Sequence, residues 1–101
     1  MATVATVERR IWSVEGFRVA VRHLDGRNVR GDRTHMPTYP FRRAMADAAN
    51  VKAWREGRFR LRYPGFEVDV LHRDGTSVHG ATLLGTVRAE YRWTRAGVAK
   101  R

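Results

Sequence analysis

The chain has 101 residues and carries twenty Lys and Arg side chains against ten Asp and Glu, which gives a net charge of +10. It has no cysteine, which excludes disulfides and thiolate metal sites. No stretch reaches the length of a membrane span, and the opening "MATVATVERR" lacks the apolar core of a signal peptide. We therefore expect one cytoplasmic domain over residues 1–101, with flexible tails at 1–7 and 94–101 and no cofactor.

The basic excess is typical of proteins that bind a polyanion. It also has a second interpretation, because only Lys52 and Lys100 are lysines and the other eighteen basic residues are arginines. Such a bias also arises from codon usage in a GC-rich genome, without any ligand.

The first predicted unit covers about residues 8–31 and ends in a β-hairpin. Phe17, Val19 and Val21 alternate with polar or small residues, the pattern of a half-buried strand. Asp25-Gly26 then predicts the turn. A three-residue loop with Gly26 in the left-handed conformation would place Val21 opposite Val29, apolar against apolar.

A helix is predicted next, over about residues 41–56. Pro40 suits the first helical position and Gly57 follows the last. Asn50 offers an alternative, since this helix could break there and Asn50 could cap a second short helix over Val51–Glu56.

The second predicted unit, residues 57–80, repeats the first at an offset of 49. "GFRVAVRHLDGRNVRG" (16–31) and "GFEVDVLHRDGTSVHG" (65–80) share Gly, Phe, Val, Val, His, Asp, Gly, Val and Gly, nine of sixteen positions. Extending the offset backwards aligns "ERRIWSV" (8–14) with "GRFRLRY" (57–63). We interpret both as lead strands, the second joined to its hairpin by a type II turn at Tyr63-Pro64-Gly65.

Alternation in "TLLGTVRAEYRW" predicts a final strand over about residues 83–93. The predicted fold is therefore α+β. It has two related antiparallel β-meanders that form a strongly curved sheet or partial barrel, with one or two helices between them.

Two segments, 52–63 and 81–101, each carry a net charge of +4. As strands, they would place five arginines on one outward face and turn their aromatic residues into the core. The best prediction from the sequence is thus a small accessory protein that binds nucleic acid by phosphate contacts, without base stacking. A solvated basic face is the competing interpretation. The candidate residues are Arg58, Arg60, Arg62, Arg88 and Arg92.

Two other functions stay open. The two hairpins differ in charge, because Arg18 aligns with Glu67 and Ala20 with Asp69. Such hairpins could face each other within one chain or across a dimer, as in a homo-oligomeric protein-interaction module. The other alternative is a small-ligand binder or enzyme with a pocket between sheet and helix.

No nucleophile–base pair, phosphate loop or dinucleotide fingerprint occurs in the sequence. His23 and His72 hold matching positions and are candidate metal ligands, with Asp25 or Asp74 as a third. The competing interpretation places each histidine at the solvated end of its hairpin, where the aspartate serves the turn.

Overall fold

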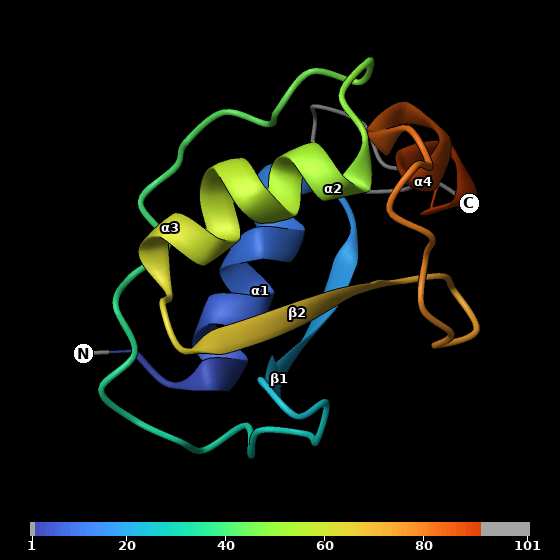
Figure 1. Ribbon diagram of the computed structural model, residues 1–101. Helices are drawn as coiled ribbons and strands as arrows, with labels where there is room; N and C mark the ends of the chain where they lie inside the picture. Colours follow the sequence, from blue (N-terminus) through green and yellow to red (C-terminus); the bar gives the residue numbers. More distant parts are fainter. Residues whose placement is uncertain (1, 92–101) are drawn as a thin grey trace.

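The computed structural model describes residues 2–91 (Figure 1). Along the chain lie helix α1 (Val4–Glu15), strand β1 (Arg18–His23), α2 (Val51–Trp54), the π-helical turn η1 (Arg55–Phe59), α3 (Arg60–Arg62), strand β2 (Phe66–Leu71) and helix α4 (Leu84–Tyr91). The α2, η1 and α3 segments follow one another without a break and form one helical stretch. Within residues 2–91, each helix is too short or too polar to cross a bilayer.

Helix α1 occupies the place of the first predicted lead strand and part of the predicted tail at 1–7. Thr3 caps it, because the Thr3 hydroxyl accepts a hydrogen bond from the Thr6 amide at 3.1 Å. Val7, Ile11 and Val14 recur at helical spacing and are buried, so burial of this apolar stripe favours helix over strand. Gly16 ends α1 in the left-handed conformation, with φ 84°.

The second helix also replaces a predicted lead strand, and it begins later than the predicted helix over 41–56. Asn50 caps it, with its side-chain oxygen 2.8 Å from the Ala53 amide nitrogen, as the alternative interpretation expected. Arginines and apolar residues do alternate in "GRFRLRY". However, Phe59 and Tyr63 are four residues apart and buried on one helical face, whereas Leu61 is 78% exposed. The period of 2 was therefore coincidental.

The two strands form one open antiparallel sheet (Figure 1). Val19 pairs with Val70 and Val21 with Val68, and all four valines are buried. At the centre of the ladder, Ala20 pairs with Asp69. These two residues hold the same position in the two similar sequence stretches, so a local pseudo-twofold axis passes between them.

Both predicted hairpin turns are present. Gly26 has φ 92° and Gly75 has φ 89°, the left-handed conformation expected of them. The Val29 amide donates to the Val21 carbonyl, and the Val78 amide donates to the Val70 carbonyl. The predicted register of the first hairpin is therefore confirmed, although each returning segment makes only an isolated bridge to its strand.

The α+β class and a helix between the two hairpins are confirmed, but the predicted meanders and curved sheet are wrong. The stretch expected to form a final strand at 83–93 contains α4, because Leu84, Val87 and Tyr91 are buried at helical spacing. In residues 2–91 the two lead strands and the closing strand are helices, so neither meander exists. Two strands remain, too few to curl into a strongly curved sheet or partial barrel.

Candidate functional site

Glu15, the last residue of α1, is the centre of a buried polar network. Its Oε2 atom accepts hydrogen bonds from the Tyr39 hydroxyl and from Arg58 Nη1, each at 2.5 Å. Its Oε1 atom accepts from the Met45 amide at 2.9 Å and from Arg88 Nη2 at 3.2 Å. The carboxylate is thus bonded on both oxygens, as a buried charge requires.

The surroundings of Glu15 are adjusted to its negative charge. Burial raises the pKa of Tyr39, and the charge of Glu15 raises it further, so that the phenol stays a donor. Burial lowers the pKa of Arg58, but the attraction of Glu15 and hydrogen bonds to Tyr39 and Glu15 outweigh it and raise the pKa overall. Arg88 is 5% exposed and also bonds Asp47 at 2.6 Å. Arg58 and Arg88 therefore hold the fold together.

The other three candidate arginines occupy different environments. Arg60 forms salt bridges with Glu67 at 2.7 Å and Glu56 at 3.7 Å. Arg62 is exposed, and its Nε donates to the Thr38 carbonyl at 3.1 Å. Arg92 lies outside the described residues. The four described arginines therefore do not form the outward row that a strand would have produced.

The two candidate metal ligands lie at opposite ends of the sheet. His23 pairs with Phe66 at one end of the ladder, whereas His72 follows Leu71, which pairs with Arg18 at the other end. His72 is therefore six residues along the strand from Phe66, and at about 3.4 Å per residue this separates the two positions by roughly 20 Å. His72 bonds Glu90 at 2.9 Å, and no group of metal-ligating side chains occurs within residues 2–91.

Opposite charges of the two similar stretches meet inside one molecule. Arg22 Nε lies 2.9 Å from Asp69 Oδ2, across the ladder between β1 and β2. Arg22 is also the register partner of Glu67. The opposite charges that suggested a dimer thus partly pair with each other within one chain.

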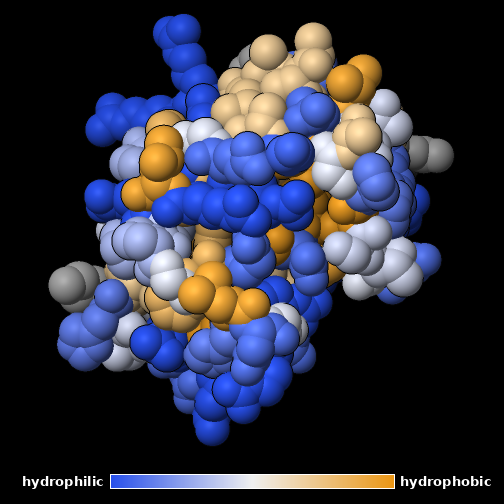
Figure 2. Space-filling model, viewed as in Figure 1, coloured by the Kyte–Doolittle hydropathy of each residue, from blue (hydrophilic) through white to orange (hydrophobic). Residues whose placement is uncertain are grey.

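A large share of the positive charge forms no salt bridge with a carboxylate. All ten carboxylates of the chain lie within residues 2–91, and each one is bonded to a cation, a hydroxyl, a histidine or a backbone amide. In the same range ten basic side chains form no salt bridge: Arg9, Arg10, Arg18, Arg33, Arg42, Arg43, Lys52, Arg55, Arg62 and Arg73. Hydrophilic side chains accordingly cover much of the face in Figure 2, with apolar patches between them.

One open groove combines two of these cations with an aromatic ring. It lies between α1 and β1, has a volume of about 260 Å³, and is lined by Glu8, Arg9, Trp12, Arg18 and Val19. Trp12 is half-buried and packs edge-on against Tyr91, with ring centroids 5.4 Å apart. Glu8 accepts a hydrogen bond from the Val21 amide at 2.9 Å, and burial raises its pKa.

A second cavity, of about 210 Å³, lies between the loop at 33–37 and the segment after α3. Tyr63 is one of its lining residues and is 1% exposed. Its hydroxyl is buried without a hydrogen-bond partner in the described structure, an arrangement that costs about 1–3 kcal/mol. Burial raises the pKa of Tyr63 to about 12, against a smaller opposing effect of Arg62, so the hydroxyl keeps its proton at neutral pH.

Sequence reasoning missed both hollows because it assigned Trp12 and Tyr63 to strands. The signal for the first was present, since Val4, Val7, Ile11 and Val14 have helical spacing. A helix with that buried stripe leaves Trp12 at the edge of the stripe. For the second cavity, only the fold brings Arg33 near Arg62.

The sequence matches no known family model, and it shows no significant similarity to any curated protein or solved structure.

Proposed function

We propose that this protein binds nucleic acid, chiefly through contacts to phosphates. One observation carries the proposal: ten cationic side chains between Arg9 and Arg73 lack a salt bridge, while every carboxylate of the chain is already bonded. With a net charge of +10, the chain carries an excess of cations that its carboxylates do not pair. Such a surface attracts a polyanion and gives binding that weakens steeply as salt rises.

The groove between α1 and β1 is the part of this surface best suited to a single strand. Arg9 and Arg18 line it and can contact phosphates, while the half-buried ring of Trp12 offers a surface for an unpaired base. The chain continues beyond Tyr91 with four more basic residues: Arg92, Arg95, Lys100 and Arg101. Tyr91, the last described residue, packs against Trp12 of the groove. We therefore propose single-stranded nucleic acid over duplex.

The test is a fluorescence-anisotropy titration of a labelled 20-nucleotide single strand and of the matching duplex, at several salt concentrations. The double variant R9A/R18A should bind the single strand at least tenfold more weakly. It should also reduce the salt slope by about 1.4, because each phosphate contact contributes about 0.7. The matched control is R27A/R30A, which removes two exposed arginines that are paired with Asp25 and Asp32.

Base contact is tested separately with W12L, which removes the aromatic ring but keeps an apolar side chain. It should weaken single-strand binding about fivefold or more and leave duplex binding nearly unchanged. Equal losses for R9A/R18A and R27A/R30A would show diffuse attraction without a site. The absence of any complex at low salt and micromolar protein would contradict the proposal.

A further inference from the structure

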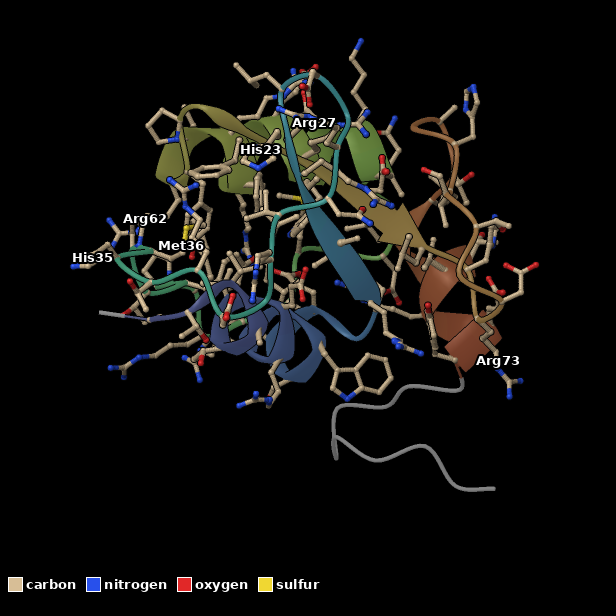
Figure 3. All side chains as sticks on the ribbon, turned by 90° about the horizontal axis from the view of Figure 1, so that it is seen from below. His23, Arg27, His35, Met36, Arg62 and Arg73 are labelled. Atoms are coloured by element: carbon tan, nitrogen blue, oxygen red, sulfur yellow. The ribbon has the colours of Figure 1, made fainter. Side chains whose placement is uncertain are left out.

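The cavity between the loop at 33–37 and the segment after α3 is a second candidate site, independent of the groove on α1. Its lining combines cations with apolar side chains, and six of its residues carry the argument: Arg33, His35, Met36, Arg62, Tyr63 and Phe66. Figure 3 shows His35, Met36 and Arg62 gathered at one side of the molecule, away from Arg27 and Arg73 of the two hairpins. A cavity of about 150 Å³ accepts benzene, so about 210 Å³ has room for one ring with a small substituent.

Two of the cations that form no salt bridge, Arg33 and Arg62, line this cavity. Arg33 places its guanidinium carbon 5.0 Å from the centre of the Phe66 ring, a cation–π contact that fixes the charge at the wall. Arg62 uses Nε to bond the Thr38 carbonyl, and neither of its Nη atoms makes a hydrogen bond within the described residues. A guanidinium of this kind can bind a carboxylate with two parallel hydrogen bonds.

Two further features distinguish the cavity from an incidental hollow. The hydroxyl of Tyr63 is fully buried and has no hydrogen-bond partner in the described structure, so it can donate a hydrogen bond to a ligand. His35 is the only non-glycine residue with positive φ in the described chain, at 66°, and lies on the same lining loop. Strained backbone of this kind clusters at ligand sites.

We propose that this cavity binds a small carboxylic acid with a single apolar ring. Arg62 and Arg33 hold its carboxylate, the Tyr63 hydroxyl supplies a further hydrogen bond after a small adjustment of the cavity wall, and Met36 and Phe66 contact the ring. The ligand must carry a negative charge because two cations without carboxylate partners line the cavity. The apolar ring is required because Met36, Pro37, Pro64 and Phe66 make up much of the wall.

The experiment is an NMR titration of the ¹⁵N-labelled full chain with benzoate, with benzamide as the neutral match and inorganic phosphate as the anion without a ring. Benzoate should shift the amides of residues 33–36 and of residues 62, 63, 65 and 66, and should bind at least tenfold more tightly than benzamide. R62Q should weaken benzoate at least tenfold. R27Q, which alters an exposed arginine of the first hairpin, should leave benzoate binding unchanged.

Y63F separates binding from folding. Removal of an unpartnered buried hydroxyl should raise the midpoint of thermal unfolding, yet weaken benzoate about fivefold. Equal affinity for benzoate and benzamide, tighter binding of phosphate, or shifts spread outside the cavity would overturn the proposal. Unchanged benzoate affinity in R62Q or in Y63F would also overturn it. Nucleic-acid binding should persist in R62Q and weaken at least tenfold in R9A/R18A, so the two proposals can be contradicted separately.

Discussion

The two similar stretches, 16–31 and 65–80, have the same local structure in different settings. Both start from a left-handed glycine, continue as a six-residue strand, and turn at Asp-Gly. The residue before the first glycine is the buried Glu15, whereas the matching position before the second is Pro64, which is exposed. The residues that the two stretches share thus specify the strand and the turn. The residues that differ determine which side chains each unit contributes to the interior.

The preceding helices differ in the same way. Helix α1 runs regularly from Val4 to Glu15, whereas the second helical stretch contains the π-turn η1 and reaches its glycine two residues later. A π-turn accommodates an extra residue in a helix. Trp54 and Phe59, five residues apart across this turn, are both fully buried.

The largest effect should follow from the residue that only the first unit possesses. E15Q removes the charge that balances Arg88 and Arg58 in the interior. Because an uncompensated buried charge is costly, the free energy of unfolding should fall by about 3–5 kcal/mol. Urea denaturation measures it. The control E56Q, on the exposed side of the second helix, should change stability by less than about 0.5 kcal/mol. Equal losses in E15Q and E56Q would contradict the assigned role of Glu15.

A smaller difference should separate the matched phenylalanines. Phe17 is 0% exposed and packs edge-on against Trp54, with centroids 5.0 Å apart, while Phe66 is only half-buried. F17A should therefore cost about 3–5 kcal/mol, and F66A less than half as much. Thermal unfolding of both variants checks this order. A larger loss of stability in F66A than in F17A would contradict this prediction.

The smallest effect should come from the matched histidines. Hydrogen bonds from His72 and from the Arg73 amide lower the pKa of Glu90, whereas His23 contacts the Phe66 ring. Because the folded-state pKa of Glu90 is lowered, its contribution to stability is present above the ordinary value near 4.5 and is lost as pH falls through the folded-state pKa.

Wild type should therefore lose more stability than E90Q between pH 6 and pH 3. Urea midpoints at each pH measure the difference, and H23Q is the control, since it leaves the bond between His72 and Glu90 in place. Parallel pH profiles for wild type and E90Q would show that Glu90 titrates alike in the folded and unfolded states.

Much of the hairpin geometry was predictable from the sequence, because Val21 and Val29 around Asp25-Gly26 specify it locally. The lead strands were not, because "GRFRLRY" satisfies both a period of 2 and the i, i+4 spacing of Phe59 and Tyr63. Tertiary burial decided between the two interpretations. Once Arg58 and Arg88 were placed on strands, Glu15 could not be recognised as their shared partner, since the three residues lie far apart in the sequence.

The pairing of Ala20 with Asp69 has a consequence for how such a chain can change over time. Each residue of one strand faces a residue of the other, and only at the centre do matching positions face each other. A substitution at Arg22 changes the contacts of Glu67 and Asp69. These two residues correspond to positions 18 and 20 in the stretch that contains Arg22. Each stretch therefore constrains the substitutions that the other tolerates.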